Sequence, residues 1–154
     1  MQSKLVIPED MWHRLRGHLL QDWNEHLAFG LAGYTKVGSS HALLMRKLIL
    51  IEDHHLEAGN ACHGLSLKLD TLLEVMNEAN KEQLVLVEAH SHPFSAETVG
   101  FSRMDLRGQR ELFIHLQDIA PGRPYGALVL AQQAVNGLIW VPGRKTPDRL
   151  KQLR

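Results

Sequence analysis

The sequence predicts an α/β (α+β) fold in which a mixed, largely antiparallel β-sheet is flanked by helices in three layers. Amphipathic segments with helical spacing alternate with short apolar runs, as expected for helices that pack on strands. Two apolar runs near the C-terminal end are joined by a polar stretch, which is typical of an antiparallel hairpin. The 154 residues show no internal repeat or linker, so we expect a single domain over residues 1–154.

The helices are predicted from apolar residues that recur every three or four positions. In the first helix, Met11, Leu15 and Leu19 share one face, and Pro8 suits the first helical turn. Before the third helix, Ser102 has the character of an N-cap. The predicted helices span residues 8–22, 66–81 and 103–118.

The strands are predicted where apolar residues run together between turn residues. The segment 24–34 is rich in small residues, so we interpret it as a central strand that its neighbours approach closely. The segment 53–64 is predicted to be irregular, and the polar tail 142–154 to be a short helix or disordered. The other predicted strands span residues 5–7, 41–52 (one long strand or two short ones), 84–92, 125–131 and 135–141.

Composition and charge argue against several function classes. Lys plus Arg and Asp plus Glu both number 17, so no basic excess favours nucleic acid or an anionic membrane surface as a partner. No apolar run approaches the roughly 20 residues of a transmembrane helix, and residues 1–8 lack the apolar core of a signal peptide. The single cysteine, Cys62, cannot form an internal disulfide, which fits a reducing compartment. We therefore expect a cytoplasmic protein.

Two histidines lie at the end of the fourth predicted strand. Because side chains alternate along a strand, His90 and His92 point to the same face, and Pro93 ends the strand just beyond them. Asp105 follows in the first turn of the helix that Ser102 caps. Two imidazoles and one carboxylate provide three protein ligands for zinc and leave a fourth position open for water, as in catalytic zinc sites.

Hydrolysis of an amide at such a site also requires a general base that takes a proton from water and returns it to the leaving amine. Glu25, at the start of the predicted central strand, is the candidate base. A hydroxyl near the metal can stabilise the developing oxyanion, and Ser102 is placed for that role. Glu88 shares a strand face with the two histidines, so it could be a rival base or ligand, or a solvated strand residue.

Each of these residues also has an ordinary structural interpretation. His90 and His92 could be strand-end histidines without a metal. Ser102 and Asp105 could form only a helix cap whose acid complements the helix dipole. Glu25 taken alone is one of 17 acidic side chains.

A second group of metal-ligating residue types lies in the irregular segment. Its spacing lacks the paired Cys-x-x-Cys pattern of a zinc site, so an ordinary loop is the simpler interpretation. The members of this group are His54, His55, Cys62 and His63.

In its motif residues the sequence resembles the JAMM/MPN+ zinc metallopeptidases. That family carries an upstream glutamate, then His-Ser/Thr-His-Pro and, after a short loop, Ser-x-x-Asp. The same order is found here in Glu25, His90-Ser91-His92-Pro93 and Ser102-Arg103-Met104-Asp105. The segment around Glu25 is similar to the bacterial (prokaryotic JAB-type) branch. The span that carries the motifs, about residues 20–141, covers most of the chain.

Two features depart from the family's pattern. The loop between His92 and Ser102 is two residues longer than is common in the family, and a loop insertion of this size costs little free energy. In addition, Ala28 stands where eukaryotic members usually carry glycine.

The resemblance implies the three-layer JAMM/MPN (cytidine-deaminase-like) architecture and zinc-dependent peptidase activity. Carried over residue by residue, it makes His90, His92 and Asp105 the zinc ligands. It also makes Glu25 the general acid/base and Ser102 a stabiliser of the tetrahedral intermediate. The family's substrates are amide bonds after the C-terminus of ubiquitin or ubiquitin-like proteins, including isopeptide bonds to lysine.

We therefore expect a bacterial hydrolase that is either a deubiquitinase-like isopeptidase or a processing protease for a ubiquitin-like protein. The resemblance also suggests an adenylating enzyme of the same pathway as a partner. Two other function classes stay open. A zinc hydrolase of small peptides or amino-acid conjugates could use the same five residues. A non-catalytic MPN scaffold module is the second class, although such modules usually lack one or more of the motif residues.

Overall fold

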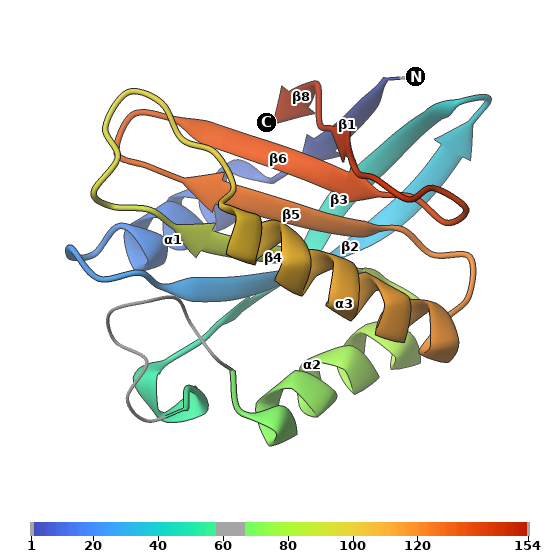
Figure 1. The fold of residues 1–154 in the computed structure, drawn as a ribbon, viewed down its shortest axis with the longest axis horizontal. Helices are drawn as coiled ribbons and strands as arrows, with labels where there is room; N and C mark the ends of the chain where they lie inside the picture. Colours follow the sequence, from blue (N-terminus) through green and yellow to red (C-terminus); the bar gives the residue numbers. More distant parts are fainter. Residues whose placement is uncertain (1, 58–66, 154) are drawn as a thin grey trace.

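The computed structural model describes residues 2–57 and 67–153. Eight strands form one mixed sheet in the order β7-β6-β5-β4-β2-β3-β1-β8 (Figure 1). The strands are Ser3–Val6 (β1), Leu27–Val37 (β2), Ser40–Leu50 (β3), Val85–Ser91 (β4), Tyr125–Leu130 (β5), Val135–Trp140 (β6), Asp148–Arg149 (β7) and Gln152–Leu153 (β8). The helices are Glu9–Leu19 (α1), Leu69–Lys81 (α2), Arg103–Ile119 (α3) and the 3-10 helix Asp53–His55 (η1). None of the helices within the described ranges has the length and apolar character needed to cross a membrane.

The centre of the sheet is built from β2 and its two neighbours. A two-residue turn joins β2 to β3, and Gly38 at its first position has φ +60°, which suits a type II′ hairpin turn. On its other side β2 pairs antiparallel with β4. β4 in turn pairs in parallel with β5, and parallel neighbours need a crossover, which α3 supplies here. This crossover starts from the C-terminal end of β4, so the first turn of α3 follows shortly after that strand.

The C-terminal tail connects the two edges of the sheet. β7 pairs antiparallel with β6, whereas β8 pairs in parallel with β1, and only residues 150 and 151 separate the two short strands. The Leu150 backbone N–H donates to the Gly137 carbonyl (2.9 Å), and the next N–H, of Lys151, donates to the Ser3 carbonyl (2.9 Å). The sheet is therefore a near-closed barrel.

The predicted three-layer JAMM/MPN architecture, with a largely antiparallel sheet flanked by helices, is wrong. The sheet curls into the near-closed barrel instead of forming a flat middle layer, and β1–β3, β1–β8 and β4–β5 are all parallel pairs. The described part contains only three α-helices. The prediction failed largely at the tail 142–154. Backbone hydrogen bonds form two-residue strands there, and the sequence shows no alternation of apolar residues from which they could be predicted.

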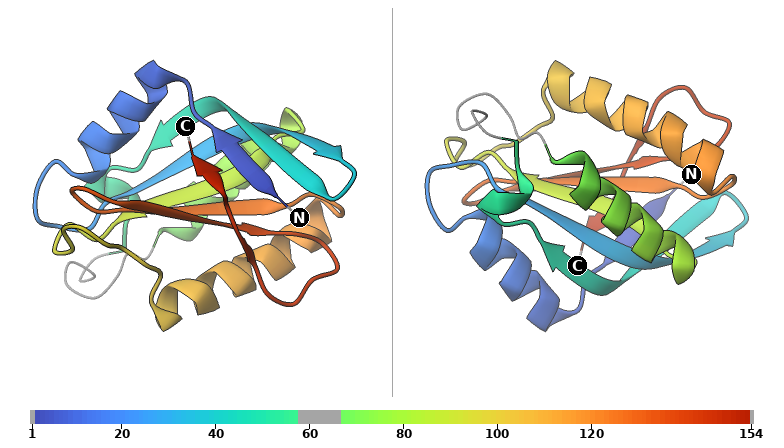
Figure 2. Two further views of the ribbon diagram at one scale, coloured as in Figure 1. Left: turned by 90° about the horizontal axis from the view of Figure 1, so that it is seen from above. Right: turned by 90° about the horizontal axis from the view of Figure 1, so that it is seen from below.

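The two faces of the sheet carry separate hydrophobic clusters. On one face, alternate residues such as Ala28 and Val87 pack with Leu15 and Leu19 of α1. On the other face, residues such as Phe29 pack beneath α2 and α3, which lie apart from α1 (Figure 2). Because side chains alternate along each strand, Glu88, His90 and His92 continue the face of β4 that α2 and α3 cover.

We expect the tail to contribute measurably to stability. Leu150, between β7 and β8, is 4% exposed and belongs to the cluster that packs with α1. The substitution Leu150→Ala should lower the free energy of unfolding by about 2–4 kcal/mol through loss of buried contacts, as measured by urea denaturation. Lys151→Ala, at an exposed neighbouring residue, is the matched control and should change it by less than about 0.5 kcal/mol. An effect of Leu150→Ala as small as that of Lys151→Ala would mean that the Leu150 side chain does not stabilise the barrel.

Candidate metal centre

The end of β4 places two buried histidines side by side. His90 and His92 are 7% and 9% exposed, and their ring centroids lie 4.9 Å apart. The backbone N–H of His92 donates to the Leu130 carbonyl (2.8 Å), which keeps this residue beside β5 after the end of β4. The intervening Ser91 is fully buried, and its Oγ accepts a hydrogen bond from the backbone N–H of His26 (2.9 Å).

A capping box at the start of α3 fixes the carboxylate of Asp105. The Asp105 N–H donates to Ser102 Oγ (3.0 Å), and the Ser102 N–H donates to Asp105 Oδ2 (2.8 Å). The same Oδ2 lies 3.3 Å from His90 Nε2 and 3.4 Å from His92 Nε2. His90, His92 and Asp105 thus converge and could hold a metal ion. No second group of this kind occurs in residues 2–57 and 67–153.

The donor set of this cluster fits a small cation. Both ring nitrogens of His90 are buried, and neither has a hydrogen-bond partner among the described residues. A buried polar atom left without a partner costs about 1–3 kcal/mol, which a ligand bond at Nε2 would offset. The spacings of 3.3 and 3.4 Å around Asp105 Oδ2 also match the edge of a tetrahedron with ligand bonds of about 2.0–2.1 Å.

The electrostatics of the cluster favour positive charge. Burial alone would lower the pKa of His90, but the neighbouring carboxylates of Asp105 and Glu88 outweigh burial and raise that pKa to about 10. Burial alone would raise the pKa of Asp105, but the imidazoles of His90 and His92 and the Ser102 N–H hold it well below its usual range. The charges around the cluster therefore favour a bound cation, either a proton or a metal ion.

Glu25 lies beside this cluster, immediately before β2. Its Oε1 is 3.6 Å from His92 Nε2, and its side chain is 24% exposed, so the carboxylate is accessible to water. Two contacts hold the residues that follow Glu25 against β4. Leu27 pairs with His90, and the Ser91 N–H donates to the His26 carbonyl (3.2 Å). The structure thus brings Glu25 to the three converging residues, close to but outside the ligand group.

Ser102 joins the cluster through its capping role. Its exposed side chain accepts from the Asp105 N–H, so the hydroxyl proton stays available for donation. A helix cap and a hydrogen-bond donor at the rim of the cluster are therefore compatible roles for this residue.

Glu88 lies on the other side of His90 and is not one of the converging ligands. Its Oε1 is 3.5 Å from His90 Nδ1, and its Oε2 accepts a hydrogen bond from the Tyr125 hydroxyl (2.5 Å). Burial, together with the charge of Glu88, raises the pKa of Tyr125 well above its ordinary value, so the phenol remains a donor. Sequence reasoning missed Tyr125, because its link to the cluster depends on the parallel register of β4 and β5.

The second group of metal-ligating residue types is not assembled in the described part of the chain. His54 and His55 lie in η1, where their ring centroids are 3.9 Å apart. The Glu52 N–H donates to His55 Nδ1 (2.9 Å), which is a local capping contact. Cys62 and His63 lie outside the described residues.

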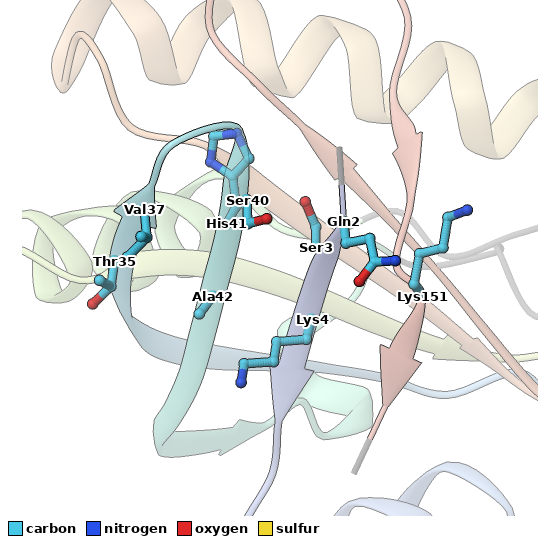
Figure 3. A pocket seen from close by; sticks show the side chains of 9 residues that line it. All are labelled: Gln2, Ser3, Lys4, Thr35, Val37, Ser40, His41, Ala42 and Lys151. Atoms are coloured by element: carbon cyan, nitrogen blue, oxygen red, sulfur yellow. The ribbon is translucent and has the colours of Figure 1, made fainter.

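A separate cavity lies at the other end of the β2–β3 hairpin. It has a volume of about 320 Å³ and is bordered by β1, β2, β3 and Lys151 of the tail (Figure 3). His41 is among its lining residues and pairs with Lys36 near the end of β2, whereas His90 pairs with Leu27 at the beginning of that strand. The cavity therefore contains none of the predicted site residues.

Comparisons with known proteins provide a fold and no function. No known protein family matches the chain by sequence, and no curated protein matches it. Among solved structures, the chain is similar to protein DSY2949 from Desulfitobacterium hafniense, a structural genomics target determined in solution. The TM-score is 0.57 at 17% identity, over 97% of this chain and 92% of that one. At this level of identity, the likeness shows the fold alone.

We expect metal affinity to depend on pH. His90 keeps its proton up to about pH 10 in the metal-free protein, so a metal ion that binds Nε2 must displace one proton at neutral pH. Raising the pH from 6 to 8 should therefore increase the apparent affinity about tenfold per unit. Competition with a chromophoric chelator of known pH dependence measures this slope. His13→Ala, at an exposed histidine, should leave the slope unchanged, and a flat profile in the unsubstituted protein would contradict the expectation.

Proposed function

We propose that the protein is a zinc-dependent metallopeptidase that hydrolyses the (iso)peptide bond after the C-terminus of a ubiquitin-like protein. The observation that carries the proposal is the convergence of His90, His92 and Asp105, with Glu25 3.6 Å from His92. The order of these residues in the JAMM/MPN+ motif adds support, because residues far apart in the sequence meet at one site.

Zinc is the metal that this donor set suits best. Two imidazoles and one carboxylate are ordinary zinc ligands, and a three-residue set leaves one coordination position open. His90, His92 and Asp105 would hold the ion. When bound, zinc supplies Lewis acidity and lowers the pKa of water at the open position.

The chain's own residues supply the proton transfers. Glu25 takes a proton from the attacking water and returns it to the leaving amine, a role that suits a partly exposed carboxylate beside the ligands. Ser102 donates its hydroxyl proton to the developing oxyanion. The hydrogen bond that Ser102 Oγ accepts from Asp105 orients the hydroxyl for this donation.

The substrate class follows from the family resemblance and suits the surroundings of the site. Phe94, just after the metal-binding motif, is 69% exposed and stacks on the ring of His92 at a centroid distance of 5.3 Å. An exposed aromatic ring beside a buried cluster can contact an extended peptide. The flexible C-terminal tail of a ubiquitin-like protein is such a peptide, and an adenylating enzyme of the same pathway is the partner that this substrate would imply.

We expect Glu25→Gln to separate metal binding from turnover. The substrates are ubiquitin-like proteins fused through their C-terminal glycine to a reporter, together with short peptides of the same cleavage sequence. The zinc-loaded protein should cleave the fusions, and Glu25→Gln should lower kcat about 10²- to 10⁴-fold with unchanged zinc content. Glu97→Gln, at an exposed acid in the loop after β4, is the matched control and should keep normal turnover.

Each contrary result has a definite meaning. Normal turnover by Glu25→Gln would reject Glu25 as the base. Equal kcat/KM for the fusions and the short peptides would favour a hydrolase of small peptides. Zinc binding without cleavage of either substrate would favour a scaffold module.

A further inference from the structure

Glu88 makes two contacts that the catalytic proposal does not use. It is two residues before His90 on the same face of β4, and its Oε1 is 3.5 Å from His90 Nδ1. The other ring nitrogen, Nε2, is the one that faces Asp105 at 3.3 Å. The imidazole of His90 therefore stands between two carboxylates, one next to each nitrogen.

Tyr125 holds the Glu88 carboxylate from the far side. The phenol is fully buried at the start of β5, and its hydroxyl donates to Glu88 Oε2 over 2.5 Å. Hydrogen bonds to an ionised carboxylate are short and strong, so this contact restricts the orientation of the carboxylate. The side chain of Glu88 is only 22% exposed, which limits competition from water. Such an arrangement differs from that of a freely solvated strand residue.

We propose that Glu88 and Tyr125 are positioning residues of the metal centre. Tyr125 orients the Glu88 carboxylate so that, when Nε2 binds a metal ion, the carboxylate accepts the Nδ1–H of His90 and keeps Nε2 as the ligand atom. The inference rests on the proposed metal site. Carboxylates that bind the outer nitrogen of a ligating histidine fix its tautomer and raise its basicity as a ligand.

The contact between Glu88 and His90 is long for a hydrogen bond. A cation at Nε2 draws electron density from the ring and makes the Nδ1–H a stronger donor. The bond should therefore shorten when the site is loaded, and Glu88 should stabilise the loaded form more than the empty one.

Two other roles for Glu88 fit the geometry less well. A general base has to reach water at the open position, and Glu88 lies beside Nδ1, away from the converging ligand atoms. Glu25 is the carboxylate that lies beside those atoms. A fourth ligand would have to belong to the converging group. That group consists of His90, His92 and Asp105 and does not include Glu88.

The experiment measures metal binding by the full chain without any substrate. Glu88→Gln, Glu88→Ala and Tyr125→Phe are compared with the unsubstituted protein and with Glu97→Gln, which removes an exposed charge from the same region. Zinc dissociation constants come from chelator competition, and cobalt substitution provides a visible spectrum that reports the ligand field. Thermal unfolding of each metal-free variant shows whether it is folded.

We expect Glu88→Ala to weaken zinc binding about 10- to 100-fold. Glu88→Gln keeps the shape of the side chain and an acceptor oxygen, so this variant should lose less zinc affinity than Glu88→Ala. Tyr125→Phe should weaken binding severalfold, and the cobalt spectrum should change in all three variants. Glu97→Gln should match the unsubstituted protein in both measurements.

Unchanged zinc affinity and cobalt spectra in both Glu88 variants would overturn the inference and leave the proposed function intact. An equal loss in Glu97→Gln would overturn it as well, because the effect would then reflect net charge alone. Failure of the unsubstituted protein to bind either metal would remove the proposed function and this inference together. Tyr125 is fully buried, so Tyr125→Phe could fail to fold. In that case the isosteric Glu88→Gln, at a side chain that is only partly buried, decides between the outcomes.

Discussion

The antiparallel pairing of β2 with β4 is the constraint on which the candidate site depends. It joins segments 65 residues apart, and at its end the Ser91 side chain and backbone both bond to the backbone of His26. Because Ser91 points to one face of the strand, its two histidine neighbours point to the other, where α3 begins. The contact that fastens the two strands therefore also sets the position of Glu25 relative to the histidines. A shift of one residue in this register would turn His90 and His92 away from Asp105.

Asp105 combines a structural and a chemical role in one carboxylate. As part of the capping box it satisfies the Ser102 N–H, and the positive end of α3 stabilises its charge. The same oxygen faces both histidines. Fold stability and the assembly of the cluster are therefore coupled, since a change that loosens the first turn of α3 also displaces a ligand atom. The aspartate, one carbon shorter than the glutamate usual in a capping box, keeps its carboxylate close to the helix end.

The local elements were largely predictable from the sequence, whereas the closure of the sheet was not. The periodicity of Met11, Leu15 and Leu19 and the N-cap character of Ser102 reflect interactions within a few residues, and such signals are visible in a sequence. The tail links β6 to β1 through backbone hydrogen bonds, and these leave no recognisable pattern of side chains in the sequence. For this reason the three-layer prediction failed.

The candidate site shows the same division between local and distant interactions. The sequence could indicate His90, His92 and Asp105 because their residue types and spacing suit a metal, and it could place Glu88 on the histidine face by parity. It could not decide among the roles left open for Glu88. The positioning role that we propose for Glu88 rests on its hydrogen bond with Tyr125, which the parallel pairing of β5 brings next to β4 from a distant part of the chain.

The pairing of β8 with β1 has a practical consequence for handling the protein. Lys4 of β1 pairs with Gln152 of β8, so the first and the last strand of the barrel are neighbours. The chain therefore enters β1 and leaves β8 at two neighbouring points. β1 meets β3 beside the hairpin turn, and the length of β2 puts this end about 30 Å along the strand from Leu27 and the histidines. A fluorescent label or carrier fused at either point should thus stay clear of the cluster. A short linker between the two points would permit circular permutation, with new ends opened in an exposed loop.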